Sequence, residues 1–275
     1  MTTRILDTGT EHLICEITDH VAIVTLNNPK KRNAFSSEMT AALHGVLKTT
    51  GEDADVRVLV LTGAADAFCA GGDVSSMGAS LADGAATPNA DAMIQRLRNA
   101  QEAVSLALYE FPKPTIAALP GAAAGAGLSL ALACDLRIAA QSAQLVPAFG
   151  AIGLSGDFGG SWLLSHLIGP ARAKEIYFTG RRVTAEDGFD LGLFNQVVAD
   201  PELPGATLEL AQQLAKGAPV ALRYMKDNIN SAMMSDFRSA LRLEADRMIR
   251  SMLTEDHRNA AQAFLEKRKP VFKGR

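Results

Sequence analysis

The sequence has few features that would indicate a secreted, membrane-bound or nucleic-acid-binding protein. Its 275 residues carry 27 Lys and Arg against 30 Asp and Glu, for a net charge of −3. Without a basic cluster there is no electrostatic surface for nucleic acid. No run approaches the roughly 18 continuous apolar residues of a membrane span. Residues 1–17 also lack the pattern of a signal or transit peptide. We therefore expect neither a nucleic-acid nor a membrane partner.

Cysteine and histidine are scarce and scattered. Cys15, Cys69 and Cys134 are odd in number and widely spaced, so they predict neither a disulfide framework nor a CxxC metal pair. A reducing cytoplasm is the simplest location for such a chain. The histidines show no HExxH or paired spacing, and we expect no metal site; they are His12, His20, His44, His166 and His257.

What the sequence does contain is an alternation of strand-like and helix-like segments. Strands are expected in residues 12–27 (two, with a turn at Asp19-His20), 56–63, 115–121, 134–146 and 192–198. Helices are expected in residues 36–50, capped by Ser36 or Ser37, and 90–111, ended by Pro112 and Pro114. This alternation predicts an α/β fold with a largely parallel sheet. Only helical patterns follow residue 203, so we expect a core domain (1–203) and a helical region (204–275). Small residues and turn formers in 76–92 predict a mobile loop.

Two glycine-rich stretches each follow a buried strand. The first is AFCAGGD (67–73) and the second is GAAAGAGLSLALACD (121–135). Bare backbone at a helix start offers unpaired N–H groups and room for close approach. Two such places on different strands could direct two N–H donors at one oxygen, which is an oxyanion hole.

Other interpretations of these stretches remain open. Small residues after a strand are common in tight turns and where a helix packs closely on a sheet. Gly125 and Gly127 also begin a dinucleotide-binding pattern, but Leu130 stands where its third glycine belongs, and no acid follows at the expected strand end. The dinucleotide interpretation therefore fails, whereas close packing stays open.

Taken together, several stretches resemble the enoyl-CoA hydratase/isomerase (crotonase) superfamily. The resemblance runs from about residue 12 to the C-terminus and covers the loops and turns of the family as well as its glycine-rich stretches. It rests on NNPKKRNAFSSEM (27–39), AFCAGGDV (67–74), FPKPTIAALPGAAAGAGLSLALACDLRIAA (111–140), GRRVTAEDGFDLGLFNQVV (180–198) and AFLEKRKPVFKGR (263–275).

The resemblance implies an α/β fold built as a spiral of ββα repeats, with a C-terminal helical trimerisation region and a homotrimer or homohexamer. It also implies an acyl-CoA thioester as substrate and no further cofactor. The amides of Gly72 and Ala126 would form the oxyanion hole. Other residues implied to contact the substrate are Arg32, Ala34, Ala70, Asp73, Val74, Gly127, Ser129, Phe264 and Lys267. Phe264 and Lys267 would reach a neighbouring subunit's CoA, although Lys267 could equally be a solvated charge.

The acids decide the reaction within this resemblance. Hydration needs one group to deprotonate water and one to deliver a proton, and family hydratases carry two glutamates for this work. Here Ser129 occupies the first position, and Ala148 or Phe149 the second. Asp157 is the nearby acid, and a single carboxylate suffices to move a proton from C2 to C4 of an enoyl-CoA. Apolar neighbours would raise its pKa; we expect Phe149, Ile152, Leu154, Phe158 and Trp162 in this role.

We therefore predict an enoyl-CoA isomerase with Asp157 as its catalytic acid–base. The competing interpretation of Asp157 is an N-cap of the helix that follows it. The competing functions are an enoyl-CoA hydratase and a non-catalytic acyl-CoA-binding subunit. A dehalogenase is disfavoured because the helix 90–111 has no histidine to act as a base.

Overall fold

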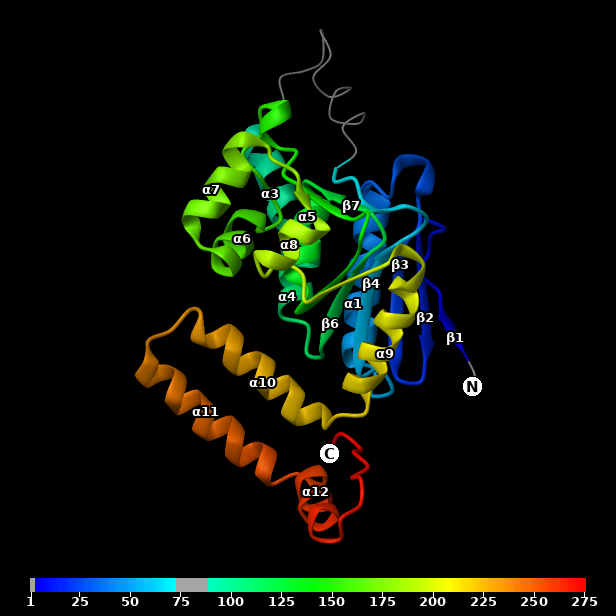
Figure 1. Cartoon of the computed structure of the whole chain (residues 1–275), viewed down its shortest axis with the longest axis vertical. Coiled ribbons are helices and arrows are strands. Elements are labelled where there is room, and N and C mark those ends of the chain that lie inside the picture. The colour runs from blue at the N-terminus through cyan, green and yellow to red at the C-terminus, as the bar shows by residue number, and fades with distance from the viewer. Residues whose placement is uncertain (1–2, 73–88) are drawn as a thin grey trace.

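The computed structural model describes residues 3–72 and 89–275. Asp73, Val74 and the larger part of the expected 76–92 loop lie outside the described residues, and residues 90–92 already belong to a helix. A seven-stranded sheet has the order β1-β2-β3-β4-β6-β8-β11 (Figure 1). Its strands are Arg4–Leu6, Leu13–Thr18, Val21–Leu26, Val58–Gly63, Thr115–Leu119, Leu136–Ala140 and Gln196–Val198.

The sheet has a parallel core, as predicted. Strands β3, β4, β6, β8 and β11 pair in parallel. At one edge of this sheet, β1 and β2 pair antiparallel with each other, and β2 pairs antiparallel with β3. The β2–β3 hairpin turns at Asp19 and His20, which have φ angles of 50° and 69°. Two consecutive left-handed residues match the right-handed twist of a two-residue hairpin, so the expected turn is confirmed.

A second, four-stranded sheet has the order β10-β9-β7-β5. Its strands are β5 (Ala67–Cys69), β7 (Ala122–Ala124), β9 (Gln144–Val146) and β10 (Val183–Thr184). The chain passes directly from β4 to β5, from β6 to β7 and from β8 to β9, so each of these three strands is followed by a short strand of the second sheet. This repetition agrees with the expected ββα repeats, and it places the two glycine-rich stretches next to each other because β5 pairs with β7.

Both predicted core helices are present. Helix α1 (Ser37–Glu52) is capped by Ser36, whose hydroxyl accepts from the amide of Met39 at 3.1 Å. The expected helix over 90–111 consists of α3 (Ala90–Gln101), a π-helical turn η2 (Glu102–Leu106) and α4 (Ala107–Tyr109).

The remaining helices cover the sheets and form the C-terminal region. Helix α9 packs against β3, β4, β6 and β8, whereas α10 to α12 extend away from the sheets (Figure 1). None of the helices in the two described ranges is long and apolar enough to cross a bilayer. The division of the chain into a core domain (1–203) and a helical region (204–275) stays a prediction. The helices are α5 (Ala126–Ala133), α6 (Gly160–Ile168), α7 (Pro170–Thr179), α8 (Ala185–Asp190), α9 (Leu203–Ala215), α10 (Pro219–Ala232), α11 (Phe237–Met252) and α12 (Glu255–Leu265); short 3₁₀ turns span Pro29–Lys31, Gly150–Ile152 and Asp200–Glu202.

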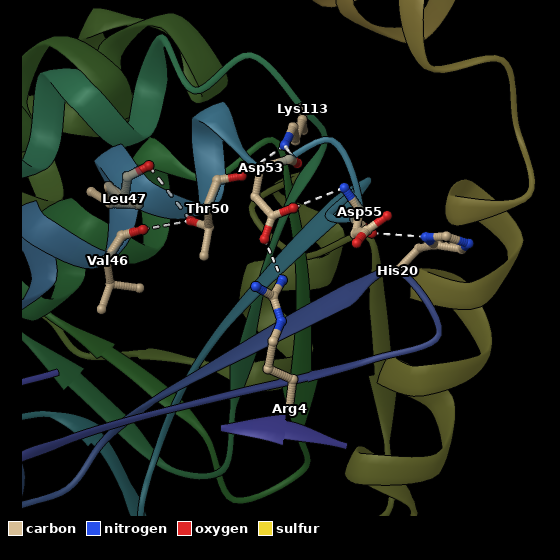
Figure 2. Close-up of polar contacts among 8 residues, drawn as sticks. All are labelled: Arg4, His20, Val46, Leu47, Thr50, Asp53, Asp55 and Lys113. Atoms are coloured by element: carbon tan, nitrogen blue, oxygen red, sulfur yellow. Dashed lines mark hydrogen bonds and ion pairs between the residues drawn. The ribbon is translucent and has the colours of Figure 1, made fainter. Parts of the chain in front are cut away.

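Lys113 binds the C-terminal end of α1 (Figure 2). Its ammonium donates to the carbonyls of Thr50 and Asp53 at 2.7 and 2.6 Å, which are among the orphan acceptors at a helix end. The side chain is partly buried, and this burial lowers the pKa of Lys113 to about 8. The Asp53 carboxylate pairs with Arg4, and this pairing lowers the pKa of Asp53. The cluster thus joins the end of α1 to the edge strand β1 and to the start of β6.

We expect Lys113→Met to lower the free energy of unfolding by about 1–2 kcal/mol, because two carbonyls in partly buried hydrogen bonds lose a charged donor at the helix terminus. Lys48→Met is the matched control, since Lys48 is an exposed residue on the same helix. Urea unfolding at pH 7 measures both. Equal stability of the two variants would contradict the role of Lys113.

Candidate active site

One cavity of about 680 Å³ gathers the residues that the sequence singled out. Gly72, Ala126 and Asp157 line it together, and they come from three separate segments of the chain. Helix α1 and its N-terminal turn form one wall, and α3 with η2 forms another. The cavity therefore lies where both glycine-rich stretches and the Asp157 turn meet.

The first amide belongs to Gly72, just beyond β5. Gly71 has φ +90°, and a Cβ atom on it would lie 2.8 Å from the carbonyl oxygen of Ala124. Only glycine fits this approach of one turn to the other. The amide of Phe35 donates to the carbonyl of Gly71 at 2.7 Å. This bond fixes the turn without using the amide of Gly72.

The second amide belongs to Ala126, the first residue of α5. Gly125 precedes it with φ +51° and ψ −121°, and no side chain caps the helix. First-turn amides have no acceptor within their own helix, so this N–H is available to the cavity. A Cβ atom on Gly71 would lie 3.4 Å from the Ala126 nitrogen, which shows how closely the two turns approach each other.

Close packing, the alternative interpretation of these stretches, is also present. A Cβ atom on Gly127 would lie 2.4 Å from the carbonyl oxygen of Cys69. Gly127 thus lets α5 pack directly on β5. Small residues in the second stretch therefore serve packing at Gly127 and leave an amide exposed to the cavity at Ala126.

Asp157 lies in the turn before α6. Its Oδ1 atom is buried and has no hydrogen-bond partner within residues 3–72 and 89–275. Burial raises the pKa of Asp157 to about 6. The N-cap interpretation is wrong, because the cap residue of α6 is Gly159 and no side chain caps that helix. The left-handed Gly159 places the helix cap two residues after Asp157, which frees the carboxylate from a capping role.

The expected apolar surroundings of Asp157 are only partly correct. Phe149 and Phe158 are buried, and Phe158 lines the same cavity. Ile152 and Leu154 are instead about half exposed, because they lie in and after a short 3₁₀ turn on the surface. Trp162 packs on Tyr109 and His166 and is not among the residues that line the cavity.

Ser129 occupies the position where the family resemblance implies a hydratase glutamate. It is fully buried on α5, and its hydroxyl donates to the backbone carbonyl of Asp157 at 2.9 Å. Among the cavity-lining residues of the described chain, Asp157 is the one carboxylate.

Comparison with known proteins identifies the family. Residues 16–275 match the model of the family described as enoyl-CoA hydratase/isomerase. The chain belongs to the enoyl-CoA hydratase/isomerase family. It is 37% identical over 265 residues to the 1,2-epoxyphenylacetyl-CoA isomerase of Escherichia coli (96% of this chain, 99% of the relative). It is 34% identical over 260 residues to the short-chain-enoyl-CoA hydratase of Clostridium acetobutylicum (94% and 96%).

The fold of the family is confirmed by solved structures. The crystal structure of an enoyl-CoA hydratase from Bacillus anthracis superposes with a TM-score of 0.86 at 33% identity, covering 96% of this chain and all of that one. Relatives within the family are named both as hydratases and as isomerases.

The residues that family resemblance implies near CoA lie in two places. Arg32, Ala34 and Ala70 lie beside the first glycine-rich turn, where the amide of Ala70 donates to the carbonyl of Arg32 at 2.9 Å. Arg32 and Ala70 are exposed, whereas Ala34 is buried. Their contact with substrate stays a prediction.

Phe264 and Lys267 lie elsewhere. Both are exposed, at and just after the end of α12. Figure 1 shows α12 at the bottom of the molecule, far from β7 in its upper part. The C-terminal tail therefore does not reach the cavity of its own chain. The expectation that they serve a neighbouring subunit stays a prediction.

Two further residues lie near Asp157 that the sequence did not indicate. Ser105, in η2, donates to the carbonyl of Phe158 at 2.6 Å. The hydroxyl of Tyr177 is buried without a partner in the described chain, and burial together with the Asp157 charge raises the pKa of Tyr177 to about 12. Neither residue carries a local sequence signal, because both reach the site through long-range packing.

Proposed function

We propose that this protein is an enoyl-CoA isomerase with Asp157 as its single acid–base group. The Asp157 carboxylate takes a proton from C2 of a 3-enoyl-CoA, and the electron pair moves into the thioester carbonyl. The amides of Gly72 and Ala126 stabilise the resulting dienolate oxygen. The protonated Asp157 then returns the proton at C4, which gives the conjugated 2-enoyl-CoA with no atom gained or lost.

One observation carries this proposal. The only carboxylate among the described cavity residues has a buried, unpaired Oδ1 atom. A carboxylate held by structural hydrogen bonds would be a weak base, whereas a desolvated one with a pKa of about 6 is suited to exchange protons near neutral pH. Among the described cavity residues there is one such group, and isomerisation needs only one.

The hydratase alternative is supported by the names of relatives such as the Clostridium acetobutylicum enzyme. Hydration needs two groups, one that deprotonates the water and one that delivers a proton to the substrate. Ser129 is already engaged with the Asp157 carbonyl, and Ala148 and Phe149 carry no ionisable group. A third candidate, a non-catalytic acyl-CoA binder, would retain both amides but would not depend on Asp157.

We further propose a homotrimer or homohexamer in the cytoplasm. Large apolar side chains on the outer helices support an assembly, because isolated chains seldom leave such a surface uncovered. Those more than half exposed on α10 and α11 are Met225, Ile229, Phe237 and Met248.

The pH dependence of isomerisation tests the proposed base. Asp157 must be ionised to accept the C2 proton, so kcat/KM should rise about tenfold per pH unit below about pH 6 and level off above about pH 7. The measurement follows the enoyl-thioester absorbance of product formed from trans-3-hexenoyl-CoA. A profile that stays flat between about pH 5 and pH 7 would contradict Asp157 as the base.

A further inference from the structure

Two buried serines hold consecutive carbonyls of the Asp157 turn. Ser129 Oγ, from α5, donates to the carbonyl of Asp157 at 2.9 Å. Ser105 Oγ, from η2, donates to the carbonyl of Phe158 at 2.6 Å. Both serines are buried, and they come from two different helical segments, η2 and α5.

The turn needs such support because its backbone is strained. Phe158 has φ +49°, a left-handed conformation that a bulky residue rarely adopts. Such residues persist only where the surrounding structure holds them in place. The hydrogen bond from Ser105 to the Phe158 carbonyl and the contact of its ring with Phe35 (6.2 Å between centroids) provide two restraints.

Ser129 also joins the two halves of the site. Its hydroxyl lies 3.4 Å from the carbonyl of Gly125, the residue before the Ala126 amide, as well as 2.9 Å from the carbonyl of Asp157. The chain leaves room for it: a Cβ atom on Gly160 would lie 2.3 Å from Ser129 Oγ. The glycine at the start of α6 thus permits the hydroxyl to reach the turn.

We propose that Ser129 and Ser105 are positioning residues that fix the direction of the Asp157 carboxylate. This inference rests on the proposed function. Ser129 holds the carbonyl of Asp157 and Ser105 holds that of Phe158, and together they keep Asp157 in the cavity that Gly72 and Ala126 also line. Ser129, at the position where family resemblance implies a hydratase glutamate, would then orient Asp157.

The test compares Ser129→Ala and Ser105→Ala with wild type on trans-3-hexenoyl-CoA. Because a displacement of about 1 Å can cost about 10² in rate, we expect kcat to fall about 10- to 100-fold in each variant, with KM changed less than about threefold. The apparent pKa of the kcat/KM profile should also fall, since a loosened turn gives Asp157 more contact with water. The control is Thr50→Val, which removes a buried hydroxyl that bonds the Val46 carbonyl within α1.

A purely structural role would lower the melting temperature in Ser129→Ala, Ser105→Ala and Thr50→Val alike and leave the pH profile unchanged; that result would overturn the proposal. Wild-type kcat in both serine variants would overturn it as well. Should Ser129→Ala not fold, Ser105→Ala decides alone. Asp157→Asn distinguishes failure of the proposed function from failure of the positioning roles. If Asp157→Asn isomerises the substrate like wild type, the proposed function fails. If Asp157→Asn is inactive but both serine variants are unaffected, only the positioning roles are refuted.

Discussion

Asp157→Asn is expected to lower the rate of 3-enoyl-CoA isomerisation by about 10²–10⁴-fold, the usual contribution of a positioned acid–base group. The asparagine keeps the size of the side chain but cannot accept a proton from C2. Substrate binding should change little, because the amides of Gly72 and Ala126 remain. Steady-state kinetics with trans-3-hexenoyl-CoA measure the effect. The control is Asp190→Asn, at an exposed carboxylate on α8.

The same substitution should stabilise the protein near neutral pH. Burial raises the pKa of Asp157 from 3.8 to about 6, so the folded state binds more protons than the unfolded state between these values. Stability associated with this group is therefore present below about pH 4 and lost as the pH rises through about 6. Asp157→Asn removes this loss, and its melting temperature should exceed that of wild type at pH 8 but not at pH 4. A variant that is as active as wild type, or less stable at pH 8, would contradict a desolvated catalytic carboxylate.

Ala126→Pro should lower kcat/KM by at least about 10²–10³-fold, the usual cost of losing one oxyanion donor. Proline lacks the amide hydrogen, and its ring would fill the space to which the N–H points. Ala126 is the first residue of α5, a position where proline is tolerated in helices. Gly125 has φ +51° and ψ −121°, the mirror image of the extended conformation that a residue before proline adopts, and glycine can hold either.

Ala126→Gly is the matched variant for this experiment. It retains the amide and removes only a methyl group, so its kcat/KM should stay within about tenfold of wild type. Circular dichroism and thermal unfolding establish that Ala126→Pro is folded. A folded Ala126→Pro variant with the kcat/KM of Ala126→Gly would show that this amide does not stabilise the transition state.

Local signals in the sequence predicted local structure well. The turn at Asp19 and His20 and the Ser36 cap of α1 depend on a few adjacent residues, and both are present. The alternation of strands and helices likewise predicted the parallel core. The two glycine-rich stretches suggested a shared oxyanion hole, and family resemblance named the amides of Gly72 and Ala126. Their meeting in one cavity depends on β5 pairing with β7, which no local signal predicts.

The interpretation of Asp157 shows where sequence reasoning reached its limit. An aspartate shortly before a helix is a typical N-cap, and only the left-handed Gly159 reveals that the helix starts later. The exposure of Ile152 and Leu154 was also not predictable, because an apolar residue in a turn has no periodicity to indicate its face. Ser105 is 53 residues from its partner Phe158, so no spacing rule could have connected them.

The central claim is that a single carboxylate moves a proton without adding water. The most direct test incubates wild-type protein separately with trans-3-hexenoyl-CoA and crotonyl-CoA and follows the products by mass and by enoyl-thioester absorbance. The account predicts that 3-hexenoyl-CoA becomes the conjugated 2-enoyl isomer at unchanged mass. Addition of one water to crotonyl-CoA, with no isomerisation of 3-hexenoyl-CoA, would contradict it.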